Sequence, residues 1–155
     1  VVNDLDSSQV WSGFRVAKRA KVSNRVVNRV IDNSVRFSAS HNGFKKQGVD
    51  CIHHRVWLAE NSSVTVTDKI IGDYTNAIGY LHLHPEIEIL NVTDEAVRLA
   101  SHGYNILIEV IGASVSIEDT TWHPQFGITI NNKKLRFSLV KRTMTIVITW
   151  KNIEI

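Results

Sequence analysis

The sequence contains few of the residues that define several protein classes. Cys51 is the single cysteine in 155 residues, so an internal disulfide framework is excluded. There are only two prolines. No run of apolar residues approaches the length of a membrane span, and we expect none. The chain also lacks a Gly-rich phosphate-binding loop, a G-x-S-x-G motif and a paired-carboxylate motif. No single catalytic signature therefore assigns its chemistry.

The chain has no initiator methionine and no secretory signal at its start. It opens on Val1 and Val2, in the middle of an apolar pattern. We therefore expect residues 1–155 to be a single β-sandwich domain excised from a longer protein. For the same reason, the missing signal says nothing about the compartment of that parent.

What the chain does contain is apolar area and a small excess of positive charge. Hydrophobic residues make up 43%, with four Trp, five Phe and three Tyr, which predicts a packed core. The formal net charge of +3 is compatible with an acidic partner without requiring one. Aromatic and basic residues do not interleave as in proteins that bind single-stranded nucleic acid, so no nucleic-acid partner is expected.

Apolar and polar residues alternate along most of the chain, which predicts short β-strands. We count eleven to thirteen of them, joined by turn signals such as Asn24 and Asp32-Asn33, and assign residues 96–100 to a strand rather than a short helix. The fold class predicted is all-β, an antiparallel β-sandwich with little or no helix. The strands expected include residues 14–22, 25–31, 52–60, 64–69, 78–84, 104–111, 114–118, 135–139 and 144–150.

The sharpest local feature is the pair His82 and His84. In a strand both imidazoles would point to one face, with Leu81 and Leu83 on the other. Such a pair could bind zinc if a third ligand were present. The candidates for that ligand are His53, His54, Asp68, Asp73 and His123, and no sequence spacing selects one of them. It could equally contact a ligand in a groove, or have a structural role only. All three interpretations stay open.

Two further groups of residues are candidate binding sites. Arg15, Arg19 and Lys21 would form a basic stripe on one face of the strand 14–22, where an acidic polymer could lie; the alternative is a solvated strand face that protects a sheet edge. The loop 122–127 carries Trp122 and His123, which could stack on sugar rings or close the end of the sandwich as an apolar plug.

Several segments resemble, in their order and spacing, the C-terminal β-sandwich region of the heparinase II/III-like polysaccharide lyases. The resemblance covers essentially the whole chain. The segments that carry it are residues 1–20 (VVNDLDSSQVWSGFRVAKRA), 40–44 (SHNGF), 54–57 (HRVW), 66–70 (VTDKI), 81–85 (LHLHP) and 122–127 (WHPQFG).

This resemblance implies a parent enzyme with an N-terminal α-helical toroid that cleaves uronate-containing polysaccharides by β-elimination. The family's catalytic residues and its structural divalent metal would then lie upstream of Val1, so that this fragment holds neither a catalytic residue nor a cofactor. Its expected partners are an acidic polysaccharide and the toroid of its own parent chain. The resemblance also implies a bacterial periplasm or cell envelope.

We therefore expect a domain that supports the substrate cleft and is not catalytic alone. The residues expected to contact substrate are His54, His82, His84, Trp122, His123, Arg15, Arg19 and Lys21. One alternative is a carbohydrate-binding or structural β-sandwich without a catalytic parent. Another is a self-sufficient metalloenzyme on the His82/His84 face. The sequence specifies neither the polysaccharide nor the oligomeric state.

Overall fold

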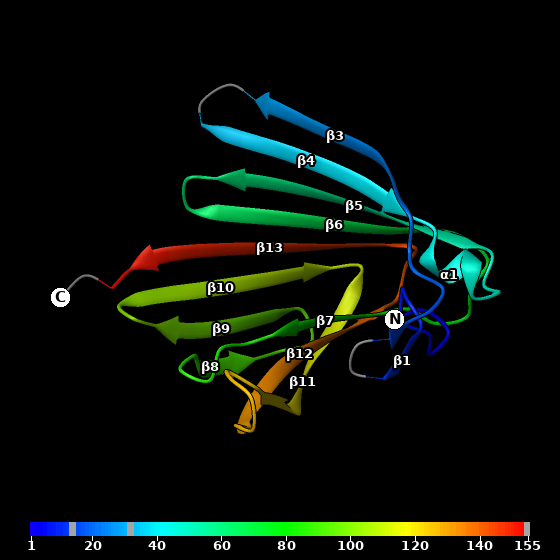
Figure 1. Ribbon diagram of the computed structural model, residues 1–155. Helices are drawn as coiled ribbons and strands as arrows, with labels where there is room; N and C mark the ends of the chain where they lie inside the picture. Colours follow the sequence, from blue (N-terminus) through cyan, green and yellow to red (C-terminus); the bar gives the residue numbers. More distant parts are fainter. Residues whose placement is uncertain (13–14, 31–32, 154–155) are drawn as a thin grey trace.

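The computed structural model describes residues 1–12, 15–30 and 33–153, and these form thirteen strands and one short helix (Figure 1). The predicted all-β class is confirmed. The elements are β1 (Val10–Ser12), β2 (Arg15–Val16), β3 (Val22–Val30), β4 (Ser34–His41), α1 (Gly43–Lys46), β5 (Cys51–Glu60), β6 (Ser63–Gly72), β7 (Ile78–His82), β8 (Glu88–Val92), β9 (Ala96–Ser101), β10 (Tyr104–Ile111), β11 (Ala113–Trp122), β12 (Ile130–Leu139) and β13 (Thr143–Asn152).

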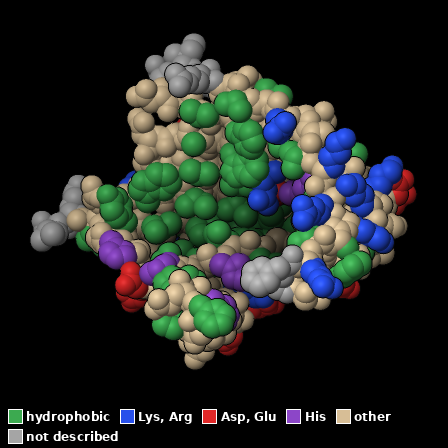
Figure 2. Space-filling view, in the orientation of Figure 1, with side chains coloured by type: hydrophobic (Ala, Val, Ile, Leu, Met, Phe, Trp, Pro, Cys, Tyr) green, Lys and Arg blue, Asp and Glu red, His purple; other side chains and the backbone are tan. Residues whose placement is uncertain are grey.

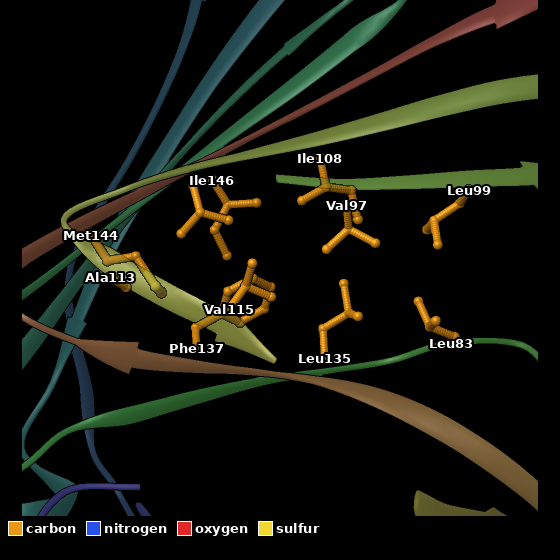
Figure 3. Packing of buried hydrophobic residues seen from close by; sticks show 11 residues of the cluster. Leu83, Val97, Leu99, Ile108, Ala113, Val115, Leu135, Phe137, Met144 and Ile146 are labelled. Atoms are coloured by element: carbon orange, nitrogen blue, oxygen red, sulfur yellow. The ribbon is translucent and has the colours of Figure 1, made fainter. Parts of the chain in front are cut away.

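The strands are arranged in one large and two small antiparallel sheets. The large sheet has eight strands in the order β3-β4-β5-β6-β13-β10-β9-β8, so the C-terminal strand β13 lies in its middle. A three-stranded sheet, β11-β12-β7, packs on the part of the large sheet that contains β9, β10 and β13 (Figures 1 and 3). The pair β1-β2 forms a sheet of its own near the N-terminus.

A single residue, Gly112, turns the chain from the large sheet into the small one. It separates β10 from β11 and adopts a φ of +81°, a conformation that favours glycine. A Cβ atom at this position would lie 2.3 Å from the carbonyl oxygen of Thr143, so the corner also has no room for a side chain. The strands expected over residues 104–111 and 114–118 are thus joined at this glycine.

The main core lies between the small sheet and the part of the large sheet that it covers (Figure 3). Alternate residues of β9, β10 and β13 meet alternate residues of β11 and β12, as the period of two requires. Leu135 and Phe137, in the strand expected over residues 135–139, are 0% and 1% exposed. The other members of this core are Leu83, Val97, Leu99, Ile108, Val110, Ala113, Val115, Met144 and Ile146.

The rest of the large sheet presents apolar side chains that the small sheet does not cover. Figure 2 shows hydrophobic side chains across the hollowed centre of this face. The cross-strand registers place Val27, Val35, Phe37, Trp57 and Val66 on the same face as the buried core residues. We call these five residues the open face. Val27 is 65% exposed and Val35 is 40% exposed.

Two predictions about the N-terminal third are wrong. The strand expected over residues 14–22 does not form as one element: of its described residues, Arg15 and Val16 belong to β2 and Val22 begins β3. Between β2 and β3 the backbone makes single hydrogen bonds to side chains instead of a ladder. The Ala20 amide donates to Ser8 Oγ, and the Lys21 amide to Asn42 Oδ1. Asn24 marks no hairpin: with φ of 51°, it sits at an irregularity within β3. Phe14 and Asp32, named in these predictions, lie outside the described residues.

Candidate functional site

A cluster of imidazole and charged side chains lies on the face of the large sheet that carries the core, beside the edge of the small sheet. The Asp68 carboxylate on β6 is nearly buried and accepts hydrogen bonds from Nε and Nη2 of Arg55, at 2.5 and 2.9 Å. His53 Nε2 lies 2.5 Å from the same carboxylate. His53 Nδ1 lies 2.9 Å from Nε2 of His41. We call Asp68, Arg55, His53 and His41 the polar network.

Strand register brings the polar network together. His53 and Arg55 are two apart on β5, so they share one face, with Asp68 opposite Arg55 on β6 and His41 opposite His53 on β4. These residues come from three strands and have no fixed spacing in the sequence. Sequence reasoning missed the network for this reason. The signal that could have found it is the alternation on β5, which puts His53 on the face of Arg55 and Trp57.

The hydrogen bonds determine which ring nitrogens carry protons. The Gly43 amide donates to His41 Nδ1 at 3.2 Å, so that nitrogen is an acceptor and Nε2 carries the proton. His41 Nε2–H then donates to His53 Nδ1, and His53 Nε2–H donates to Asp68. Both nitrogens of each imidazole are engaged in this way. The network therefore holds its members in place.

The electrostatics of the network agree with this assignment. Burial, and after it the neighbouring His53 and Arg55, lower the pKa of His41 to about 4, so His41 is neutral at pH 7. Burial alone would raise the pKa of Asp68. The hydrogen bonds from His53 and Arg55 outweigh that effect and hold the pKa below its ordinary value, so Asp68 is ionised. The charges of Asp68 and Arg55 then offset each other.

Two pockets adjoin the network. One, of about 140 Å³, lies between the network and the N-terminal residues, and Val1, Arg55 and Met144 contribute to its lining. The other, of about 170 Å³, is lined by Arg55, Trp57 and residues of β7 and β13. The Arg55 guanidinium lies 5.5 Å from the ring centroid of Trp57. This end of the open face can thus offer a guanidinium and an aromatic ring to whatever covers it.

Three of the predicted site residues, His84, Trp122 and His123, lie at or beside the end of β11. The ring centroids of His84 and Trp122 are 4.8 Å apart in an edge-on contact. The His123 ring is held between the hydroxyls of Thr121 and Thr129, at 2.9 and 3.3 Å. A groove of about 490 Å³ adjoins His84, with Pro85, Asp119, Asn132 and Lys133 in its lining.

The strand expected over residues 78–84 ends earlier than predicted. Strand β7 ends at His82, and His84 belongs to the turn before β8. His82 is exposed and lies opposite Lys134 of β12. Among the described residues, no group of three His, Cys, Asp or Glu side chains could hold a metal ion.

The basic residues gather near the N-terminal segment and α1. Arg15 lies on β2, whereas Arg19 and Lys21 lie in the irregular stretch before β3, so they do not form a stripe on one strand. All three are exposed. The Lys46 ammonium donates to the carbonyl oxygen of Arg19 at 2.8 Å and brings another cation to this region. Figure 2 shows Lys and Arg side chains concentrated on the right of the view, where Figure 1 places α1.

His54 lies apart from the other predicted site residues. It alternates with His53 and Arg55 on β5, so it projects from the opposite face of the large sheet. Its Nδ1 is 2.9 Å from Ser40 Oγ. His54 is therefore not brought together with His84, Trp122 or the basic residues.

A family model described as heparinase II/III-like, C-terminal, matches residues 1–151. No curated protein matches the chain. None of the described helices is long and apolar enough to cross a membrane.

Solved structures share the fold at low sequence identity. The structure of heparan sulfate lyase HepC from Pedobacter heparinus matches with a TM-score of 0.68 and 13% identity, over 86% of this chain and 22% of that one. A heparinase III gene product matches with a TM-score of 0.64 and 17% identity, over 83% of this chain and 22% of that one. The chain thus spans about a fifth of the length of these structures.

Proposed function

The chain belongs to the heparinase II/III-like family, as its C-terminal domain, and from this premise we propose that it supports the substrate cleft of a longer polysaccharide lyase. That protein would cleave an acidic, uronate-containing polysaccharide by β-elimination. A base removes the proton α to the uronate carboxylate, an acid protonates the leaving glycosidic oxygen, and the carboxylate charge is neutralised as the intermediate forms. The observation that carries the proposal is the family match along residues 1–151.

In this proposal the domain binds and supports, and does not catalyse the reaction alone. The described residues offer no donor set that suits a divalent metal, so any structural metal of the whole protein would be held elsewhere. An extracellular polysaccharide as substrate implies action in the periplasm or at the cell envelope.

Two exposed regions are the proposed substrate contacts. Arg15, Arg19 and Lys21 would attract sulfate and carboxylate groups of the polymer through long-range electrostatics. Trp122, backed by His84, presents an aromatic surface of the kind that stacks on sugar rings. His82 and His123 lie on the same small sheet or its adjoining loop. His54 is the remaining proposed contact, and it would act on the opposite face of the large sheet.

The test is polysaccharide cleavage by the full-length protein, followed through the absorbance of the unsaturated uronate product, with heparan sulfate and other acidic polymers as substrates. Replacing Arg15, Arg19 and Lys21 by Ala should raise KM roughly tenfold at low salt, with kcat nearly unchanged and the difference shrinking as salt is added. The control replaces Arg98 and Lys151 by Ala, which removes two positive charges from the far face of the large sheet, against three in the test variant. It should leave KM unaltered.

Two outcomes would overturn this proposal. If the full-length protein bound acidic polymers and cleaved none of them, the alternative of a carbohydrate-binding or structural module would replace the lyase. If the control variant raised KM as much as the test variant did, net charge rather than the N-terminal basic region would explain the effect.

A further inference from the structure

One edge of the small sheet is unpaired along most of its length. Strand β12 pairs with β7, and the Leu83 amide continues that ladder by donating to the Lys133 carbonyl. In an antiparallel strand, the backbone N–H and C=O groups of alternate residues point to opposite sides. The odd-numbered residues of β7 bond to β12, so the even-numbered residues point their N–H and C=O groups away from β12. The Ile78 amide donates to the Val1 carbonyl, and the Val1 amino group donates to the Ile78 carbonyl, both at 2.9 Å. The backbone amides and carbonyls of Tyr80 and His82 that point away from β12 have no backbone partner among the described residues.

The N-terminal residues already begin a new strand on this edge. The Asn3 amide donates to the Asn76 carbonyl, Val2 lies opposite Ala77, and Val1 lies opposite Ile78. The direction is antiparallel to β7. A chain continued backward from Val1 in the same direction would put its second residue before Val1 opposite Tyr80 and its fourth opposite His82.

The place that such a strand would occupy is beside the open face. The 170 Å³ pocket lies along this edge, with Tyr80 and Leu81 of β7 on one side and Trp57, Val66 and Ile148 of the large sheet on the other. A strand there would direct every second side chain toward this pocket and the others toward solvent. It would thus bury part of the apolar surface that Figure 2 shows in the hollow of the molecule.

We propose that, in the full-length protein, the polypeptide leading into Val1 pairs antiparallel with the free edge of β7 and covers the adjoining part of the open face. The small sheet then has a fourth strand, and the core extends from β13 toward β5. Strand addition at an open edge is a common way for a sheet to acquire a partner. This inference rests on the proposed function only in taking the chain as part of a longer protein.

Two further observations support the proposal. The solved structures with this fold are far longer than the chain, which covers about 22% of each. Burial also lowers the pKa of the Val1 amino group, because an ammonium is disfavoured at this position. A peptide N–H in its place would make the same bond to the Ile78 carbonyl without a charge. Both observations favour a continuous chain over a second copy as the occupant.

Amide hydrogen exchange in the full-length protein tests the pairing. We expect the Tyr80 and His82 amides to exchange roughly 100-fold more slowly than unpaired amides, as slowly as those of Gly79 and Leu81, which bond to β12. Free exchange at Tyr80 and His82, with Gly79 and Leu81 protected, would overturn the proposal. Protection that depended on protein concentration would also overturn it, because a second copy would then cover the edge.

A variant separates the edge from the rest of the fold. Tyr80→Pro removes the outward amide, and Tyr80→Phe is the matched control that keeps it. We expect Tyr80→Pro alone to make the segment before Val1 susceptible to limited proteolysis, at least tenfold faster than in the control. Slow exchange at Leu135 and Phe137 in both variants would show that the core is intact. Equal proteolysis of the two variants would count against the pairing.

The exchange and proteolysis experiments test the β7 edge independently of the lyase proposal. Protected amides in a protein that cleaves no polymer would leave this inference intact and remove the proposed function. If the protein cleaves a polymer while the Tyr80 and His82 amides exchange freely, the proposed function stands and this inference is overturned.

Discussion

One row of cross-strand neighbours crosses the large sheet through Val27, Phe37, Trp57, Val66 and Ile146. Its two ends differ sharply, since Val27 is 65% exposed and Ile146 is 7% exposed. The side chains are of the same apolar kind, on the same face of one continuous sheet. What differs is the layer above them, because the small sheet reaches the β13 end and not the β3 end. Alternation thus determines which face of the sheet a side chain occupies, while a second layer determines whether that side chain is buried.

The largest expected effect compares two phenylalanines, one in each region. Phe137 is 1% exposed within the core, and Phe37 lies on the open face against Trp57, with ring centroids 5.0 Å apart. In chemical unfolding of residues 1–155, Phe137→Ala should cost about 3–5 kcal/mol and Phe37→Ala about 1 kcal/mol. Equal costs would contradict the comparison. In the full-length protein the gap should narrow if a cover reaches Phe37.

The polar network at the boundary of the two regions should give the next largest effect. Asp68→Asn would leave Arg55 and His53 without their carboxylate in a nearly buried site, at a cost of about 3 kcal/mol in the free energy of unfolding. Asp119→Asn is the matched control: Asp119 also pairs with a cation, Lys133, but its side chain is 87% exposed. That change should cost no more than about 0.5 kcal/mol. A small effect of Asp68→Asn would mean that water reaches the network.

Acid should weaken the same boundary by a smaller amount. His41 has a pKa of about 4 in the folded protein against an ordinary 6.5, so the unfolded chain takes up the proton first and stability falls between these two pH values. After allowance for partial exposure, the loss should be about 2 kcal/mol. The lowered pKa of Asp68 adds a further loss below its ordinary pKa of 3.8.

Chemical unfolding at several pH values measures this loss. The matched variant is His41→Gln, which lacks the titrating group and should show a smaller decline between pH 6.5 and 4. If the wild-type protein were equally stable at both ends of that range, the burial of a neutral His41 would be refuted.

The sequence predicted the C-terminal half of the fold well. The strand predicted over residues 104–111 has the bounds of β10, and the strands predicted over residues 135–139 and 144–150 lie within β12 and β13. In this half, alternation coincides with a covering layer, so the pattern and the burial agree. Residues 96–100 likewise form a strand rather than a helix.

The N-terminal third was harder to predict for a physical reason. Residues 15–21 alternate as a strand would, yet the backbone amides of Ala20 and Lys21 donate to the side chains of Ser8 and Asn42 instead of to a neighbouring strand. The polar network was missed because strand register, and not spacing, brings His41 to His53. The pairing of His84 with Trp122 was likewise invisible, since it depends on where β7 ends.

The position of β13 has a consequence for how the chain acquires its fold during synthesis. This strand joins β6 on one side to β10 on the other, and the bonded pair Thr67 and Thr145 lies 78 residues apart in sequence. A ribosome that has released β3–β6 and β8–β10 has therefore made two half-sheets that cannot yet join. Their exposed edges must stay apart until the last strand emerges. Folding of the large sheet is thus coupled to completion of the chain, and a nascent chain arrested before β13 would expose two open edges to a chaperone.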